Sequence, residues 1–134
     1  MKMCPVIHFE MPAENKKRMS DFYGKVFGWK TNMLGPEMSE YVTVETTEAD
    51  KKTRRPKSPG AINGGFYQKP DDPFGQYPSV VIAVDDIKKY MEEVKAAGGR
   101  IHGKPEMIPG IGWYVSMIDT EGNRVSLLQP IGQM

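Results

Sequence analysis

The segment VIHFEM, residues 6–11, carries the side chains best suited to chemistry in this chain. Its residues alternate as in a β-strand, so His8 and Glu10 share one face and the apolar residues between them point to the other. An imidazole titrates near neutral pH and can transfer protons, and together with carboxylates it can bind a divalent metal ion. The segment therefore indicates a metal site, acid–base chemistry or the polar wall of a ligand pocket. His8 is the best candidate for a catalytic residue.

Two segments with helical spacing must lie near the strands that present these groups. The first covers residues 13–28, has apolar side chains at intervals of three and one, and reaches a natural stop at Gly28. The second covers residues 84–99 and repeats the pattern, with Asp85 or Asp86 available as its N-cap. Both patterns predict a helix with one buried face.

One predicted strand precedes each helix and three follow it, so the chain reads as one βαβββ pattern written twice. The strands before the helices are PVIHFEMP and PSVVIAVDD. The later strands are GWKTNMLG, EYVTVETT and NGGFYQKP in the first half, and GGRIHGKP, GWYVSMIDT and GNRVSLLQP in the second. We expect one domain over residues 1–134, with module one at about 4–70 and module two at about 77–131.

Three segments resemble the vicinal oxygen chelate superfamily, which includes glyoxalase I, bleomycin-resistance proteins and extradiol dioxygenases. They are PVIHFEMPAENKKRMSDFYGKVFGWK, AVDDIKKYMEEVKAAGGRI and DTEGNRVSLLQ, the last similar to the family's closing hairpin D-P-x-G-N-x-hydrophobic-E. The resemblance implies an α+β fold in which two tandem βαβββ modules form a curled eight-stranded mixed sheet. In that fold the sheet is a U-shaped trough, and the helices cover its convex side.

The resemblance also implies four positions for metal ligands, two in the opening strands and two in the last strands of the modules. Carried onto this sequence, these positions fall at His8, Val81, Gly65 and Ser126. Only the histidine is a good ligand for a divalent ion, although Glu10 or Glu45 could join it. We therefore expect no metal cofactor, and an open trough better suited to an organic ligand.

Aromatic side chains add to this candidate site. Tyr41 and Trp113 fall at corresponding positions of the two halves, where they could stack on a planar ligand or simply pack within the sheet. Glu45 shares a strand face with Tyr41. The predicted ligand-binding residues are His8, Glu10, Tyr41, Glu45, Gly65, Tyr67, Val81, Trp113 and Ser126.

Composition excludes several classes of partner. Lys plus Arg number 18 and Asp plus Glu number 17, so the net charge of +1 gives no general attraction to nucleic acid or membranes. The basic run DKKTRRPK, residues 50–57, lacks interleaved aromatics and suggests a solvated loop. One cysteine, no signal-like apolar region and no membrane-length apolar stretch lead us to expect a cytoplasmic protein.

These observations favour a protein that binds a small organic ligand in the trough without the usual catalytic metal site. The alternative is a lyase or isomerase of the lactoylglutathione lyase type, using His8 with Glu10 or Glu45. A third possibility is antibiotic sequestration of the bleomycin-resistance type, which near-neutral charge favours least. We expect a homodimer, formed through sheet edges or helices.

Overall fold

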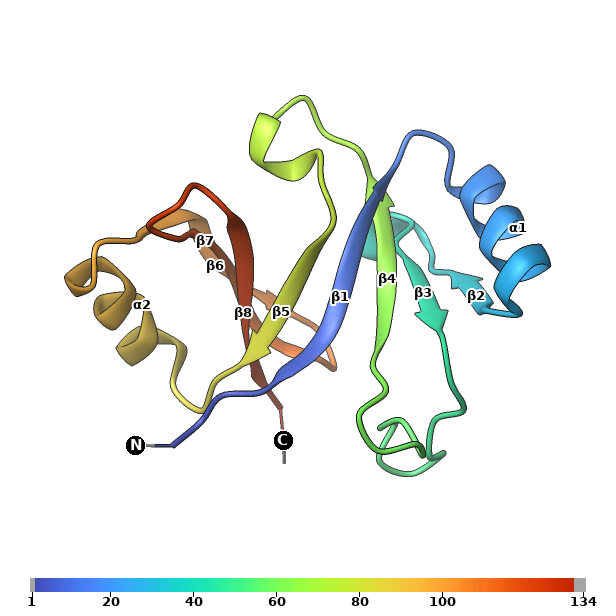
Figure 1. Cartoon of the computed structure of the whole chain (residues 1–134), viewed down its shortest axis with the longest axis horizontal. Helices are drawn as coiled ribbons and strands as arrows, with labels where there is room; N and C mark the ends of the chain where they lie inside the picture. The colour runs from blue at the N-terminus through green and yellow to red at the C-terminus, as the bar shows by residue number, and fades with distance from the viewer. Residues whose placement is uncertain (1, 132–134) are drawn as a thin grey trace. The chain divides into compact units, whose positions relative to one another are not determined.

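The computed structural model describes residues 2–131 and has the βαβββ order twice (Figure 1). The first set of elements is β1 (Val6–Ala13), α1 (Lys16–Phe27), β2 (Lys30–Met33), β3 (Val42–Glu45) and β4 (Asn63–Gln68). The second set is β5 (Ser79–Ala83), α2 (Ile87–Ala96), β6 (Arg100–Ile108), β7 (Gly112–Ile118) and β8 (Arg124–Pro130). Short 3-10 turns lie at η1 (Pro36–Met38) and η2 (Pro73–Gly75).

Hydrogen bonds join the strands of the first βαβββ set in the order β2-β3-β4-β1 and those of the second set in the order β5-β8-β7-β6. Parallel pairs (β1 with β4, β5 with β8) and antiparallel pairs both occur, which confirms the predicted α+β fold with an eight-stranded mixed sheet. The chain forms two compact units. The first unit is His8–Pro78, and the second unit combines residues 2–7 with residues 79–131.

In the first unit, the helix covers one face of the sheet. The buried core consists of Val42, Val44 and Phe66, with side chains of α1 such as Tyr23 packed against it. Phe9 of β1 joins this core. Because alternate residues of a strand point to opposite faces, His8 and Glu10 lie on the face away from α1.

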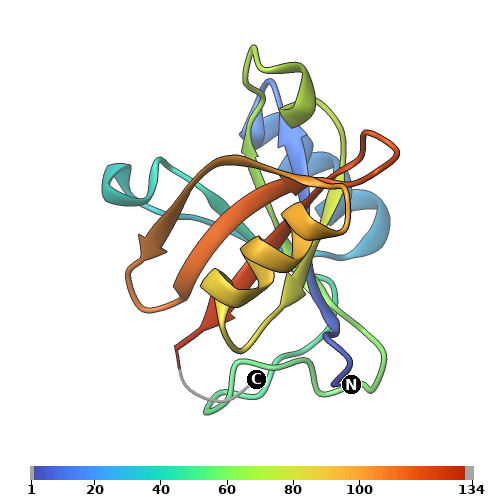
Figure 2. The same ribbon diagram turned by 90° about the vertical axis from the view of Figure 1, so that its left-hand side faces the viewer.

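The second unit repeats this arrangement with α2. Its core cluster joins Val84, Ile87, Val115 and Leu127. Figure 2 shows α2 lying across the strands of this unit. Val81 of β5 is paired with Ser126 of β8, and both point to the face away from α2.

Side-chain caps begin both helices. Asn15 accepts a hydrogen bond from the backbone N–H of Arg18, and Asp86 accepts one from that of Lys89. The second helix is therefore capped by Asp86, which resolves the choice between Asp85 and Asp86. The first helix ends at Gly28 in the left-handed conformation (φ 75°), as its sequence predicts.

Loss of the α2 cap provides a test of this local structure. Asp86→Ala leaves the N–H of Lys89 without its acceptor, and we expect it to lower the free energy of unfolding by about 1 kcal/mol. Asp85→Ala is the matched control. It removes only an exposed ion pair with Lys2, 3.4 Å long, and is expected to change stability by less than about 0.5 kcal/mol. Urea unfolding of both variants compares the two effects; equal losses would contradict the capping assignment.

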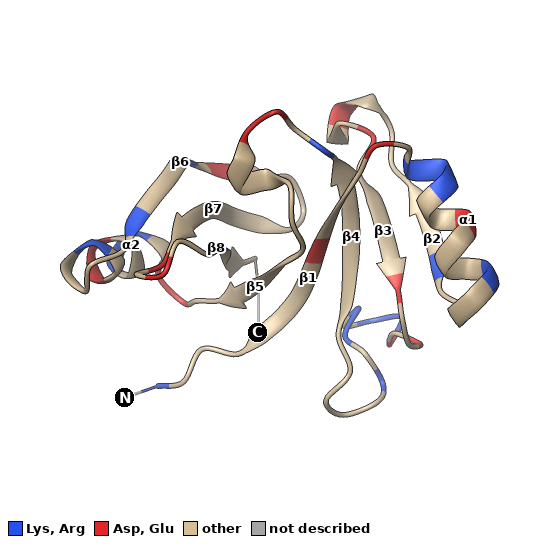
Figure 3. Ribbon diagram, turned by 45° about the horizontal axis from the view of Figure 1, so that its top comes forward, with Lys and Arg blue, Asp and Glu red and all other residues tan. Residues whose placement is uncertain are grey.

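The basic run of residues 50–57 lies in the connection between β3 and β4, and its cations are exposed (Figure 3). The carboxylate of Asp50 accepts hydrogen bonds from the backbone N–H groups of Lys52 and Thr53, which shapes the turn. Neither helix in the described part of the chain has the length and apolar character of a membrane span.

Candidate functional site

The first unit brings His8, Tyr41 and Glu10 into one hydrogen-bonded cluster. The Tyr41 hydroxyl donates to Glu10 Oε2 over 3.3 Å, and His8 Nε2 lies 3.1 Å from the same hydroxyl oxygen. The phenol has only one proton, and it donates this proton in the hydrogen bond to Glu10. The phenol oxygen must therefore accept the hydrogen bond with His8, so His8 donates from Nε2–H. Tyr41 therefore links the imidazole to the carboxylate.

Gly65 makes room for this cluster. It is paired with Glu10 across β1 and β4 and with Thr43 across β3 and β4, so it lies beneath the cluster. A Cβ added to Gly65 would overlap the hydroxyl and ring of Tyr41. The phenol of Tyr41 thus occupies the space that a side chain at position 65 would need.

Burial determines the electrostatics of this cluster. Glu10 is 8% exposed, and burial lowers the pKa of His8 below 6.5, with the Glu10 carboxylate acting in the opposite direction. The lowered pKa keeps the imidazole neutral at pH 7. A neutral imidazole that donates from Nε2 leaves Nδ1 as an acceptor.

The lowered pKa has a consequence for stability. Below pH 6.5, His8 binds a proton more readily in the unfolded chain than in the folded protein. Folding therefore becomes less favourable as the pH falls. The contribution of neutral His8 is complete above pH 6.5 and declines as the pH falls toward the lowered value. We expect the unfolding free energy to drop more between pH 7.5 and 5.5 in the parent protein than in His8→Gln. Parallel pH profiles from urea unfolding would refute this.

The second unit has its own polar cluster, centred on Ser126. This serine is fully buried, and its hydroxyl lies 2.7 Å from Tyr114 Oη and 3.1 Å from Ser116 Oγ. Arg124 Nη1 donates to it over 3.4 Å. Hydroxyl and guanidinium groups make this a hydrogen-bonding environment and a poor one for a cation. Of these residues, only Ser126 was expected from the sequence; Tyr114 and Ser116 come beside it through the pairing of β7 with β8.

The expected correspondence of Tyr41 with Trp113 is wrong. Val115 packs into the core beside α2, so Trp113, two residues earlier on the same strand, shares that face. Tyr41 lies on the opposite face of its sheet, away from α1. Tyr114, bonded to Ser126, is the aromatic residue of β7 on the matching face. A one-residue slip in the overlay exchanges the two faces of a strand.

The correspondence of His8 with Val81 also differs, by two residues. Glu10 is paired with Gly65 as Val81 is paired with Ser126, and the N-caps Asn15 and Asp86 give the same offset. Val81 therefore corresponds to Glu10, and the counterpart of His8 is Ser79. The shift preserves the strand face, because it is a full period of the strand. Among the described residues, the Ser79 hydroxyl is buried without a hydrogen-bond partner.

Two other predicted residues lie outside these clusters. Glu45 is exposed at the end of β3, opposite Lys30 of β2. Tyr67 donates its hydroxyl to the backbone oxygen of Gly75 over 2.8 Å, which ties the η2 segment to β4. In this structure Tyr67 positions a loop.

The residues present do not fit the metal site that the fold family implies. The His8 cluster offers one imidazole and one carboxylate, and a phenol lies between them. Ser126 and Val81 supply no strong donor in the second unit. Across residues 2–131, no three His, Cys, Asp or Glu side chains are grouped so that they could hold a metal ion.

Solved structures with the same fold are distant in sequence. A hypothetical protein from Bacillus halodurans C-125 matches with a TM-score of 0.70 and 14% identity, covering 99% of both chains. A Streptomyces coelicolor methylmalonyl-CoA epimerase variant matches with a TM-score of 0.67 and 11% identity, covering 98% of this chain and 100% of that one. A glyoxalase/bleomycin resistance protein/dioxygenase superfamily member from Vibrio splendidus 12B01 has a TM-score of 0.58 and 14% identity, covering 96% and 100%. Identities this low establish the fold alone.

Sequence comparison places the chain more firmly. No curated protein sequence matches it. The family model described as Glyoxalase/Bleomycin resistance protein/Dioxygenase superfamily matches residues 6–127, which run from the start of β1 into β8. The chain therefore belongs to the Glyoxalase/Bleomycin resistance protein/Dioxygenase superfamily.

Proposed function

We propose that this protein binds a small organic ligand at the His8–Tyr41–Glu10 cluster, without a divalent metal ion. The observation that carries the proposal is the Tyr41 hydroxyl, which bonds to both other side chains above Gly65. A metal ion would need the imidazole and carboxylate to converge on one point, whereas here each is engaged with a phenol. Position 65, which has no side chain, cannot add a third donor.

The cluster suits a ligand that has both hydrogen-bond donors and acceptors. The neutral His8 ring donates from one nitrogen and accepts at the other, while Glu10 accepts. A ligand hydroxyl or carbonyl can exchange partners with Tyr41 without leaving a buried polar group unsatisfied. Because such groups are costly to leave unpaired, this cluster would discriminate between ligands by polarity more than by size.

A second candidate function is proton transfer, as in a lyase or isomerase. The observation favouring it is that Glu10, a buried carboxylate, is joined to an imidazole through one phenol. A carboxylate in this position can take a proton from carbon, and the phenol can donate a hydrogen bond to an oxygen that gains charge. The Streptomyces coelicolor methylmalonyl-CoA epimerase has a similar fold. Because its sequence is only 11% identical to this chain, the similarity supports a shared fold and not a shared activity.

Thermal shift and calorimetry on four proteins test the proposed binding. The parent, His8→Ala, Tyr41→Phe and Glu45→Gln would be titrated with a panel of small hydroxy and carbonyl compounds. A ligand at a hundredfold excess over its Kd stabilises the parent by about 2.7 kcal/mol. We expect His8→Ala and Tyr41→Phe to weaken binding roughly tenfold, since each removes one hydrogen bond to a buried group. Glu45→Gln is the control and should bind like the parent.

The metal-free aspect needs its own measurement. The parent would be titrated with Ni, Zn, Mn and Fe ions, each in the absence of organic ligand. If the parent binds one ion per chain and His8→Ala does not, the proposal of a metal-free site is wrong. Turnover of the methylglyoxal–glutathione adduct that collapses in His8→Ala or in Glu10→Gln would instead establish the second candidate.

A further inference from the structure

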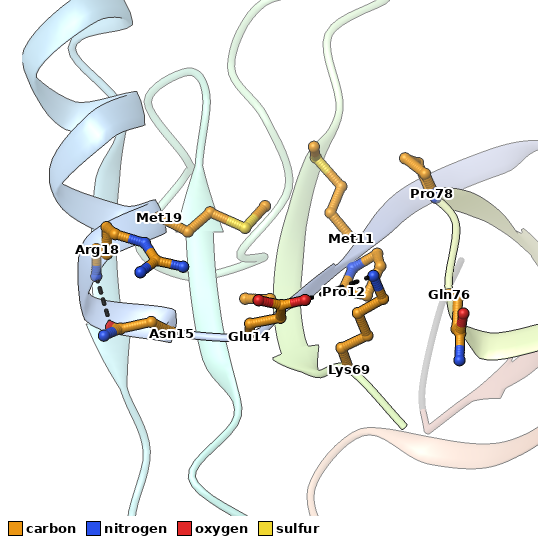
Figure 4. Close-up of a pocket in the computed structure, with 10 residues that line it drawn as sticks. Met11, Pro12, Glu14, Asn15, Arg18, Met19, Lys69, Gln76 and Pro78 are labelled. Carbon is orange, nitrogen blue, oxygen red and sulfur yellow. Dashed lines mark hydrogen bonds and ion pairs between the residues drawn. The ribbon is translucent and has the colours of Figure 1, made fainter. Parts of the chain in front are cut away.

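A hollow of about 340 Å³ opens in the first unit beside the start of α1 (Figure 4). Its walls come from the end of β1, the first turn of α1 and the segment between β4 and β5. Met11 of β1 lines it, and Met11 belongs to the strand face that packs beneath α1. The hollow lies at the end of β1, and neither His8 nor Glu10 lines it. Its volume is at the lower end of small-molecule sites.

The inner wall is apolar and adaptable. Met11 and Met19 both line the hollow and both pack against the core of Val42, Val44 and Phe66. Thioether side chains have several rotatable bonds and polarisable sulfur, so they can fit irregular apolar ligands. This wall is suited to a hydrocarbon or aromatic body.

The opposite wall is held in place by hydrogen bonds. Gln76 lines the hollow, and its Nε2 donates to the backbone oxygens of Pro70 and Asp71, each over 3.1 Å. Asp72 caps the η2 turn by accepting from the backbone N–H of Phe74. The segment is thus ordered by its own contacts, and a ligand would meet a preformed wall.

The rim carries two cations and one anion. Lys69 Nζ lies 3.8 Å from Glu14 Oε1, whereas the guanidinium of Arg18 makes no hydrogen bond or ion pair within residues 2–131. Figure 4 shows the Glu14 carboxylate between the Arg18 and Lys69 side chains. The first turn of α1 has no acidic residue. The rim therefore has a net positive charge, carried by Arg18.

We propose that this hollow is a second binding site, which takes a small organic monocarboxylate. The apolar body of the ligand packs on Met11 and Met19, and its carboxylate pairs with Arg18 at the rim. The planar guanidinium matches a carboxylate with two parallel hydrogen bonds. Glu14 opposes the ligand by charge repulsion, which disfavours dianions. The site does not involve His8, Tyr41 or Glu10, so its failure would leave the proposed function unaffected.

Octanoate is the test ligand and octanol its uncharged counterpart. The full chain would be prepared with ¹³C-labelled methionine methyl groups and titrated while their NMR signals are followed. The Met11→Leu and Met19→Leu variants each lack one labelled methyl group, which assigns the two signals. We expect octanoate to shift both signals in a saturable manner. The octanol response should be at least about tenfold weaker, because it lacks the charge-assisted pair. The remaining methyl signals report whether each variant is folded.

Three variants that each change one charge test whether the octanoate carboxylate binds at Arg18. Arg18→Gln should weaken octanoate binding roughly tenfold, and Glu14→Gln should tighten it by about twofold to fivefold, since repulsion is removed. Lys17→Gln changes the same charge one residue away, outside the hollow, and should leave affinity within about twofold. The proposal is overturned by the absence of saturable shifts at Met11 and Met19. It is also overturned if Arg18→Gln and Lys17→Gln, both folded, bind octanoate equally.

Discussion

Gly112→Ala is expected to destabilise the protein by about 3 kcal/mol, the largest effect we predict for one substitution. Gly112 begins β7 with φ at 147°, a conformation that residues with a side chain rarely adopt. A Cβ at this position would also overlap the backbone carbonyl of Gln129 on β8. A backbone atom within a paired strand cannot move aside as a side chain can. Either β7 separates from β8 at this end, or the chain there adopts another path.

Gly110→Ala separates the two costs. Gly110 also has a positive φ, 77°, but nothing lies within 4 Å of an added Cβ. Its substitution should therefore lower the free energy of unfolding by about 1 kcal/mol, because only the unfavourable backbone conformation contributes and no steric overlap is added. Chemical unfolding of both variants gives the difference. If Gly112→Ala loses no more stability than Gly110→Ala, the close approach of β7 and β8 at this point is wrong.

Gly65→Ala should cost about 2 kcal/mol, and it should also disrupt the His8–Tyr41–Glu10 cluster. The added methyl group would overlap the ring and hydroxyl of Tyr41, so the phenol must move away from both partners. His8 and Glu10 would then lose their shared hydrogen-bond partner. The variant should consequently bind ligand at this cluster more weakly than the parent.

A double-mutant cycle shows whether Tyr41 causes this effect. A Tyr41→Ala background removes the three atoms nearest to an added Cβ, so Gly65→Ala should cost less than about 0.5 kcal/mol there. The coupling between positions 41 and 65 should be at least about 1.5 kcal/mol, measured by urea unfolding of the four proteins. Additive losses would mean that the glycine is needed for another reason.

Sequence reasoning was most accurate for features that depend on neighbouring residues. The helix that stops at Gly28 and the strand alternation through His8 agree with the structure. The predicted apolar face of this helix agrees only in part, because Met19 and Tyr23 pack against the core whereas Phe22, Val26 and Phe27 are exposed. These patterns follow from the geometry of a single helix or strand, so they need no knowledge of distant contacts. The duplicated order of elements follows from the same local patterns.

Reasoning between elements was less accurate. The overlay of the two halves assigned Trp113 to the site face, although Tyr114 lies there, and matched His8 with Val81 when the counterpart is Ser79. Loops of different length separate the strands in the two halves. Local patterns do not determine how many residues a loop adds, and one residue of error reverses a strand's faces.

The amino-acid sequence by itself determined the two βαβββ modules and the placement of His8 and Glu10 on one strand face. It did so because helix and strand periodicities are properties of the local chain. Only the tertiary structure decided that Tyr41 lies between these two side chains and that Gly65 leaves space for it. It also decided that the hydroxyl groups of Tyr114 and Ser116 lie beside Ser126. Such contacts join residues tens of positions apart. They depend on strand pairing, register and side-chain packing, which become defined when the whole chain has folded.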